Sequence, residues 1–203
     1  MSLELWLAFC AASIVILMIP GPTVLLTLSY ALSQGRRVAL ATAAGVALGD
    51  FAAMTASMLG LGALLMTSAS LFIALKWVGA AYLIWLGVGL LRAAPTTPDI
   101  EADPVAARSV FSHAFLVTAL NPKSIAFFVA FAPQFVDQGL AYLPQITVMI
   151  ATFVGLATLN IFVYALAASH LRTHIRRPST LRWLNRAGGA SLISMGAATA
   201  VTA

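Results

Sequence analysis

Two ionisable side chains lie deep inside apolar stretches of this 203-residue chain. Asp50 lies in a segment, 38–75, that contains no Lys or Arg, and Lys123 follows Asn121-Pro122 in a second apolar segment. A charge near the centre of a bilayer costs about 2.5–3.5 kcal/mol on insertion scales, and such groups usually line a cavity or a pathway. Asp50 is able to take up a proton or to bind an ammonium group, and Lys123 is able to bind a carboxylate. The two residues therefore indicate a transport site, with Asp50 and Lys123 as its proton-coupling candidates.

Proline breaks accompany both charges. Pro20-Gly21-Pro22 interrupts the first apolar stretch and Pro122 interrupts a later one, and each proline removes a hydrogen bond from a helix ladder. The N–H and C=O groups freed at half-helix ends are suited to the carboxylate and ammonium ends of a zwitterion. The predicted substrate-binding residues are Pro20, Gly21, Pro22, Thr23, Asn121, Pro122, Lys123 and Ser124.

The composition indicates a polytopic membrane protein. The chain is 61% hydrophobic and 8% charged, whereas an average soluble domain has about 25% charged residues. The formal net charge of +5 does not indicate nucleic-acid binding, because the basic residues are few and lie at the ends of apolar segments. The single cysteine, Cys10, excludes an internal disulfide and a multi-cysteine metal site. No metal or organic cofactor is expected.

The apolar segments must position these residues. A helix that crosses the hydrocarbon core needs about 20 apolar residues, and six segments meet this length: 3–32, 38–66, 70–91, 110–136, 142–169 and 184–202. The sequence thus predicts an all-α integral membrane protein, a single domain over 1–203, in which the first and fourth of six transmembrane helices are interrupted by proline. Segment 93–108 is expected to link two three-helix halves, about 1–92 and 109–203. An odd number of helices per half gives the halves inverted orientations, as in many transporters.

Basic residues set the expected orientation. They occur in the first, third and fifth connections and are absent from the second and fourth, near 67–69 and 137–141. The positive-inside rule then places both termini outside the cytoplasmic membrane. Gly45 and Gly49 lie at four-residue spacing, which allows two helices to approach closely. Such faces are equally suited to contacts within one chain and to a homodimer.

The polar features are expected at one depth. Thr23 lies 13 residues before Arg36, and Lys123 lies 15 residues after Arg108. Asp50 lies 13 residues after Arg37. At about 1.5 Å per helical residue, all three lie roughly 20 Å from the cytoplasmic connections. This agreement predicts a shared site built from both halves.

The motifs resemble those of the LysE/RhtB family. The first half carries Pro20-Gly21-Pro22-Thr23, Gly35-Arg36-Arg37 and Gly45-Val-Ala-Leu-Gly49-Asp50, and the second carries Asn121-Pro122-Lys123-Ser124 and Phe127-Phe128-Val129-Ala130-Phe131-Ala132-Pro133-Gln134-Phe135. The resemblance covers essentially the whole chain. It implies antiport-type export of amino acids or related metabolites across a bacterial inner membrane, driven by protons or by the membrane potential. The form of the motifs is closer to the RhtB-like branch, which implies neutral amino acids.

Other interpretations stay open. Asp50 and Lys123 are also compatible with a structural ion pair that sets helix register, and the prolines with simple kinks. Asn160 is either a helix–helix hydrogen-bonding group or a cavity group. Export of a non-amino-acid metabolite or a cation and a non-transporting scaffold are the functional alternatives. An intramembrane aspartyl protease needs two carboxylates at one site, and Asp50 has no second deep acidic residue, so no catalytic residue is assigned.

Overall fold

The computed structural model describes residues 1–19, 21–34, 38–92, 106–175 and 178–201. Pro20, the arginines at 36 and 37, and most of the expected linker lie outside these ranges. All regular secondary structure among the described residues is helical, and no strand occurs among them. The all-α class predicted from hydropathy is therefore confirmed.

In the described part of the chain, eight α-helices, one π-helix and one 3₁₀-helix follow one another. They are α1 (Leu3–Met18), α2 (Pro22–Gln34), α3 (Ala39–Thr67), α4 (Ala69–Arg92), α5 (Ala107–Ala119), α6 (Pro122–Ala126), the π-helix η2 (Phe127–Phe131), the 3₁₀-helix η3 (Ala132–Phe135), α7 (Tyr142–Ile175) and α8 (Pro178–Val201). The first predicted segment appears as α1 and α2, and the fourth appears as α5, α6, η2 and η3, so each is interrupted near its proline.

Four stretches are long and apolar enough to cross a membrane. They are Ala39–Ala63, Ile73–Arg92, Ala107–Phe135 and Tyr142–Ala165. The pair α1 and α2, bent by 59°, makes a fifth when it is counted as one broken span. The helix α8 is not among them, so the sixth span stays a prediction. The chain is a multi-pass helical membrane protein with four or five such spans in its described part.

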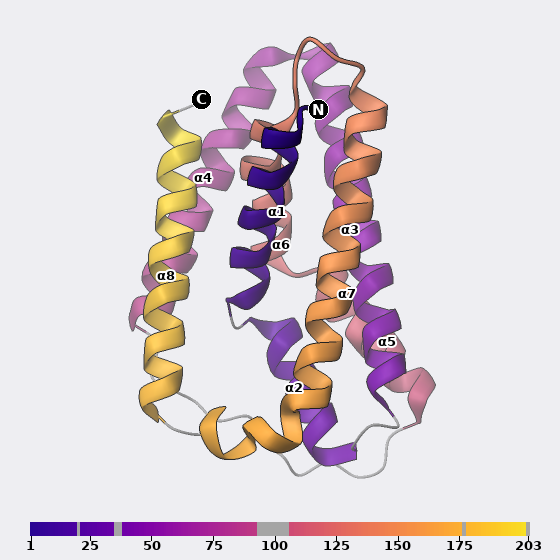
Figure 1. Cartoon of the computed structure of the whole chain (residues 1–203). Helices are drawn as coiled ribbons and strands as arrows, with labels where there is room; N and C mark the ends of the chain where they lie inside the picture. The colour runs from indigo at the N-terminus through magenta and orange to yellow at the C-terminus, as the bar shows by residue number, and fades with distance from the viewer. Residues whose placement is uncertain (20, 35–37, 93–105, 176–177, 202–203) are drawn as a thin grey trace.

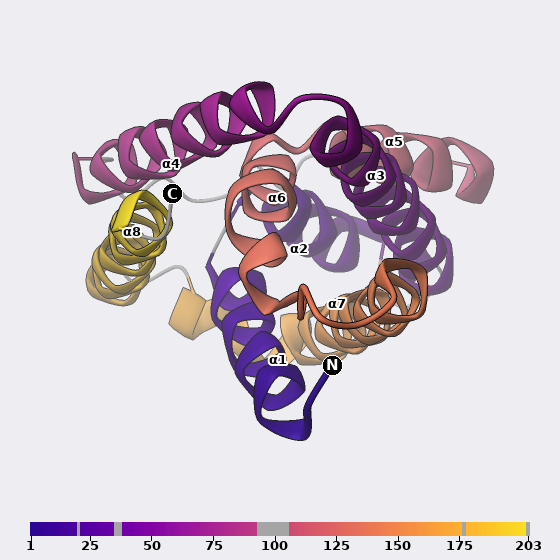
Figure 2. The ribbon, with the colours of Figure 1, turned by 90° about the horizontal axis from the view of Figure 1, so that it is seen from above.

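One half of each broken helix lies at the centre of the bundle. Seen from above, α2 and α6 lie inside a ring formed by the longer helices (Figure 2). α4 packs along α8 on one side, and α3 packs against α5 and α7 on the other. The two chain termini lie at the same end of the bundle (Figure 1). The ends of the half-helices are thus enclosed by protein, where irregular backbone is tolerated at membrane depth.

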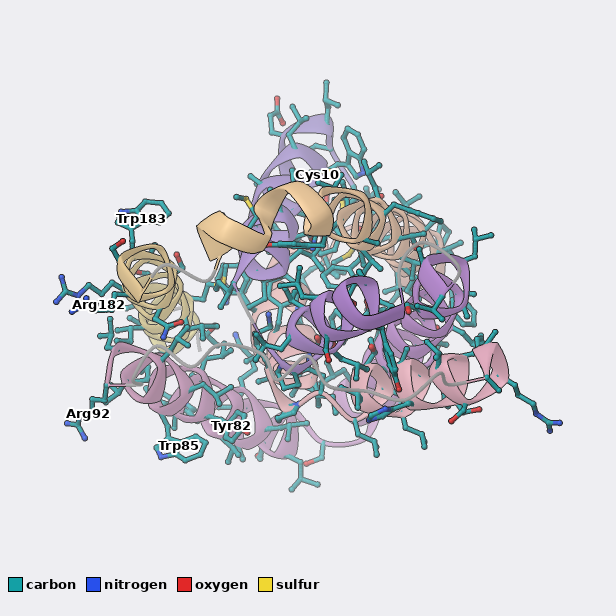
Figure 3. All side chains as sticks on the ribbon, turned by 90° about the horizontal axis from the view of Figure 1, so that it is seen from below. Cys10, Tyr82, Trp85, Arg92, Arg182 and Trp183 are labelled. Carbon is teal, nitrogen blue, oxygen red and sulfur yellow. The ribbon has the colours of Figure 1, made fainter. Side chains whose placement is uncertain are left out.

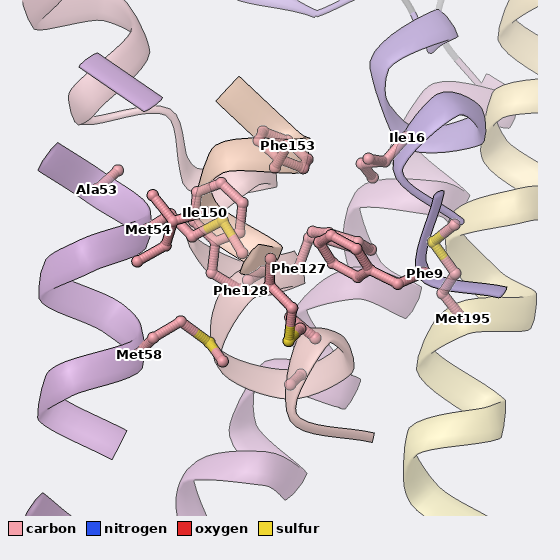
Figure 4. Packing of buried hydrophobic residues seen from close by; sticks show 14 of the residues in the cluster. Phe9, Ile16, Ala53, Met54, Met58, Phe127, Phe128, Ile150, Phe153 and Met195 are labelled. Atoms are coloured by element: carbon pink, nitrogen blue, oxygen red, sulfur yellow. The ribbon is translucent and has the colours of Figure 1, made fainter. Parts of the chain in front are cut away.

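An aromatic cluster fills the bundle between the breaks and the end that carries the termini. Phe9, Phe127, Phe128 and Phe153 are almost fully buried and belong to one hydrophobic core (Figure 4). The rings of Phe128 and Phe153 meet edge to face with centroids 4.8 Å apart. Phe127 and Phe128 begin the π-helical turn that follows α6, and such turns are frequent at functional sites. The cluster closes the interior on this side.

Gly45 and Gly49 lie at the closest contact between α3 and α5. A Cβ atom at Gly45 would lie 2.5 Å from the carbonyl oxygen of Phe111, and one at Gly49 would lie 2.8 Å from Cβ of Thr118. Side chains larger than hydrogen are therefore excluded at both positions. This contact brings Asp50, the next residue of α3, against the end of α5.

We expect Gly45→Ala to destabilise the protein by about 1–3 kcal/mol, because the added methyl group overpacks the contact with α5. Gly60→Ala on the same helix is the matched control, since a Cβ there meets no atom within 4 Å. Alanine improves helix propensity by about 1 kcal/mol over glycine, so the control should be neutral or stabilising. Thermal unfolding of the detergent-purified variants measures both. Equal midpoints for the two variants would contradict the close α3–α5 contact.

Candidate functional site

The break after α1 exposes main-chain carbonyl groups inside the bundle. α1 ends at Met18, and Ile19 leaves the helix with extended backbone. The last carbonyls of a helix have no partner within that helix. The ammonium group of Lys123 donates to the carbonyl oxygens of Ile16 at 3.0 Å and of Ile19 at 2.8 Å. Lys123 therefore caps the end of α1 from the other half of the chain.

Asn160 completes this cap. Its Nδ2 atom on α7 donates to the carbonyl oxygen of Leu17 at 3.2 Å, and its side chain also lines the cavity described below. Asn160 is thus both a helix–helix hydrogen-bonding group and a cavity group, the two roles that the sequence left as alternatives. Lys123 and Asn160 together donate to three of the four carbonyl groups from Ile16 to Ile19, namely those of Ile16, Leu17 and Ile19.

The second break is closed by its own asparagine. α5 ends at Ala119, and α6 begins at Pro122, whose missing N–H suits the first position of a helix. The side chain of Asn121 accepts a hydrogen bond from the main-chain N–H of Lys123 at 3.1 Å. This is the usual N-cap geometry, and it sets the direction in which the Lys123 side chain leaves α6.

Hydrogen bonds join the two breaks. Asn121 Nδ2 donates to Thr23 Oγ1 at 3.2 Å, and Thr23 Oγ1 lies 3.3 Å from Thr118 Oγ1. Thr23 is in the first turn of α2, whereas Thr118 is in the last turn of α5. The first half of the chain is therefore tied to the second at the level of both interruptions. Thr118 was not predicted as a site residue, and its only sequence signal is its position three residues before Asn121.

A small cavity lies between the breaks. Its volume is about 20 Å³, which is room for about one water molecule. Five of the predicted site residues line it: Thr23, Asp50, Asn121, Lys123 and Ser124. An amino acid does not fit, so a substrate would require the surrounding helices to separate. The binding and coupling roles of these residues stay predictions.

One carboxylate oxygen of Asp50 has no hydrogen-bond donor among the described residues. The Asp50 side chain is 2% exposed, and the oxygen without a donor is Oδ1. The two hydrogen bonds of the Lys123 ammonium go to carbonyls of α1 rather than to this carboxylate. A buried carboxylate without a donor is costly while it is charged. Asp50 is therefore placed to hold a proton or to receive a cationic group.

Three further predicted residues lie beside Lys123, and Pro20 lies outside the described residues. Gly21, Pro22 and Pro122 line a second cavity, to which Asn121 and Lys123 also belong. A Cβ atom at Gly21 would lie 3.2 Å from Nζ of Lys123, so glycine leaves room for the ammonium group. No group of three His, Cys, Asp or Glu side chains that could hold a metal ion occurs in the described part of the chain.

Comparisons with known proteins identify relatives of this chain. A family model described as LysE type translocator matches residues 14–202. The chain is 33% identical over 199 residues to a protein of Salmonella typhimurium named homoserine/homoserine lactone efflux protein, with 97% of this chain and 96% of the relative covered. It is 33% identical over 197 residues to an uncharacterized membrane protein of Vibrio cholerae, covering 97% and 96%.

A shorter match reaches a leucine efflux protein of Klebsiella pneumoniae, 32% identical over 134 residues, which are 65% of this chain and 63% of the relative. No solved structure matches the chain.

Removal of the Lys123 ammonium should destabilise the protein more than removal of the Asn160 amide. Lys123→Met leaves two carbonyls of α1 without a donor, whereas Asn160→Leu leaves one, and each buried unsatisfied acceptor costs about 1–3 kcal/mol. Thermal unfolding in detergent, at a pH where wild type is stable, compares the variants. The capping role of Lys123 is contradicted if Lys123→Met unfolds at the wild-type temperature.

Proposed function

Since the chain belongs to the LysE-type translocator family, we propose that it is a secondary transporter that exports amino acids across the bacterial cytoplasmic membrane. The relatives named as efflux proteins act on homoserine, its lactone and leucine. They support a small zwitterion or a close derivative as the cargo of this chain.

One observation carries the proposal: two interrupted membrane helices from different parts of the chain meet around an acidic and a basic side chain. Interrupted helices in corresponding positions are the usual construction of a transporter site near the bilayer midplane. Here the breaks after α1 and after α5 are joined by the Thr23–Asn121 hydrogen bond, and Asp50 and Lys123 line the cavity between them. A scaffold has no need for such a cavity.

The groups around the cavity have complementary roles in this proposal. Lys123 has three N–H donors, two of which bind carbonyl groups at the end of α1, and in this proposal a substrate carboxylate competes with these carbonyls for the ammonium group. Asp50 accepts either the substrate ammonium or the coupled proton. Asp50 does not carry the proton and bind the substrate ammonium at the same time, because the ammonium group pairs with the charged carboxylate. Such exclusion is the simplest way to exchange an amino acid for a proton.

Movement of two inverted halves, about 1–92 and 109–203, would open the cavity alternately to each side. The aromatic cluster of Phe9, Phe127, Phe128 and Phe153 blocks the path to the end that carries the termini. The hydrogen bonds between Thr23, Thr118 and Asn121 hold the halves together at the breaks. Both contacts must loosen when the cavity opens.

We place the termini outside and the opposite end of the bundle in the cytoplasm. The described arginines at helix ends lie away from the termini, and Arg92 and Arg182 project outward in the view from below (Figure 3). Trp183 lies beside Arg182 there, as expected at a membrane–water interface. This orientation makes the cytoplasm the side that supplies the cargo.

Asp50→Asn should abolish export of an isotopically labelled amino-acid pool, because the amide cannot release a proton or pair with an ammonium group. Asp137→Asn is the matched control, since Asp137 accepts a hydrogen bond from the N–H of Gly139 at 2.9 Å in the 136–141 segment and lies outside the cavity. Efflux is measured from cells with equal membrane abundance of wild type and both variants.

The outcomes separate the alternatives. Loss of efflux in Asp50→Asn alone supports the proposal and names the cargo. Equal efflux by wild type and Asp50→Asn assigns Asp50 a structural role. Failure of wild type to change efflux of any amino acid would overturn amino-acid export and favour another metabolite, a cation or a scaffold.

The orientation has a separate test in single-cysteine proteins. In a Cys10→Ser background, Gln138→Cys should react with a membrane-impermeant maleimide in intact cells, whereas Ser109→Cys should react only after the membrane is permeabilised. Both side chains are exposed and lie at opposite ends of the bundle. The reverse labelling pattern would place the termini in the cytoplasm.

A further inference from the structure

A buried hydroxyl group on α1 has no partner in the described part of the protein. Ser13 is 0% exposed, and its Oγ atom forms no hydrogen bond with the described residues. It lies four residues after Phe9 and three residues before Ile16, and these three are the buried residues of α1. Phe9 and Ile16 point from α1 into the core (Figure 4). Ser13 lies between them on the same face of the helix, so its side chain faces the core as well.

The unpartnered hydroxyl of Ser13 differs from other hydroxyls of the bundle. Serine and threonine in a helix commonly donate to the carbonyl oxygen four residues earlier. Side chains that do so here, at 2.7–2.9 Å, include those of Thr27, Thr42, Thr158, Ser191 and Thr199. Ser13 does not use the carbonyl group of Phe9 in this way. Its hydroxyl is therefore free to bind a group that is not part of the protein.

Ser13 lies between the small cavity and the aromatic cluster. Ile16 lines the cavity, whereas the ring of Phe9 packs against that of Phe127 in the cluster, with centroids 6.5 Å apart. At about 1.5 Å per residue, Ser13 is roughly 5 Å along α1 from Ile16 and roughly 6 Å from Phe9. In the proposed transport cycle, a molecule that leaves the cavity toward the termini passes Ser13 before it reaches the cluster.

The charged ends of an amino acid need a polar group on this route. A carboxylate or an ammonium group is costly in an apolar environment when it has no hydrogen-bond partner. Ser13 is the one polar side chain among the buried residues of α1. A serine hydroxyl has one donor and two acceptor positions, so it is able to bind a carboxylate that has left an ammonium group.

We propose that the hydroxyl of Ser13 forms an outer substrate subsite, to which the carboxylate of the exported amino acid binds after it leaves Lys123 and before the aromatic cluster opens. The inference rests on the proposed function and adds a second binding position on the outward half of the route. It gives α1 a side chain that binds the substrate, in addition to the carbonyl groups that bind Lys123.

The test compares Ser13→Ala with Thr55→Val, because each change removes a buried hydroxyl that has no partner among the described residues. Thr55 lines a groove between α3 and α7 beside Phe51 and Leu59, which are 49% and 47% exposed, and it does not line the small cavity. Both variants should unfold in detergent at the wild-type temperature or up to about 2–4 °C above it, since neither loses a hydrogen bond within the protein.

Export should distinguish the two variants. Uptake of each member of the labelled amino-acid pool into inside-out vesicles of equal protein abundance gives the maximal rate and the half-saturating concentration. Ser13→Ala should lower the maximal rate about tenfold, the loss usual for one hydrogen bond to a charged group. The half-saturating concentration should change much less, because binding from the cytoplasmic side occurs at Asp50 and Lys123. Thr55→Val should match wild type in both quantities.

Three results would overturn the inference. An unchanged maximal rate in Ser13→Ala would show that the hydroxyl does not act on the substrate. An equal loss of rate in Ser13→Ala and Thr55→Val would show a general response to the loss of a hydroxyl. A lower unfolding temperature of Ser13→Ala would show that the hydroxyl has a partner within the protein. Amino-acid export itself stands in all three cases, and it fails only if wild type transports no member of the pool.

A second readout reports the opening of the route at Ser13. In a Cys10→Ser background, Ser13→Cys should react with an impermeant maleimide added outside intact cells. The reaction should be at least several-fold faster in cells loaded with the exported amino acid than in unloaded cells, because Ser13 is fully buried in this structure and becomes accessible only when the outer end opens. Absence of reaction during export would place Ser13 away from the outward route and would overturn the subsite.

Discussion

The arrangement of the bundle depends on the need to satisfy main-chain groups where a membrane helix is broken. Water is absent from the hydrocarbon core, so every carbonyl freed by a break needs a donor from the protein. At the end of α1, Lys123 supplies two hydrogen bonds and Asn160 supplies one. These donors come from α6 and α7, which lie far along the chain. The break in the first half is therefore stable only when the second half is in place, and any movement between the halves must change this cap.

This constraint explains why Oδ1 of Asp50 receives no hydrogen bond from the described residues. The close α3–α5 contact at Gly49 brings Asp50 to the cavity, but the neighbouring ammonium is engaged on α1. A substrate carboxylate that draws Lys123 away from α1 would weaken the cap, and a substrate ammonium would meet Asp50 at the same moment. In our proposal, cargo binding and loosening of the break are thus one event. In the same proposal, the aromatic cluster keeps the opposite exit closed until the helices move.

Hydropathy and proline positions were sufficient to predict the helical membrane class and the two interruptions, because both follow from local composition. The depth argument also anticipated that Thr23, Asp50 and Lys123 lie near one another. The hydrogen bonds from Lys123 to the carbonyl groups of Ile16 and Ile19 could not be predicted, since they depend on where α1 ends relative to α6. Hydropathy likewise does not distinguish a π-helical turn at Phe127–Phe131 from an α-helix. The sixth span was the weakest prediction, because α8 is rich in small and polar residues. Among the described residues, α8 is not one of the helices that are long and apolar enough to cross a membrane.

The most direct test of the account is a structure of the protein determined with its exported amino acid bound, the cargo having been identified by efflux. The account predicts the carboxylate of the amino acid at Nζ of Lys123, between the ends of α1 and α6, with the hydrogen bonds from Lys123 to Ile16 and Ile19 lengthened or lost. An amino acid bound away from both breaks, with the Lys123 cap unchanged, would contradict the claim that the breaks form the transport site.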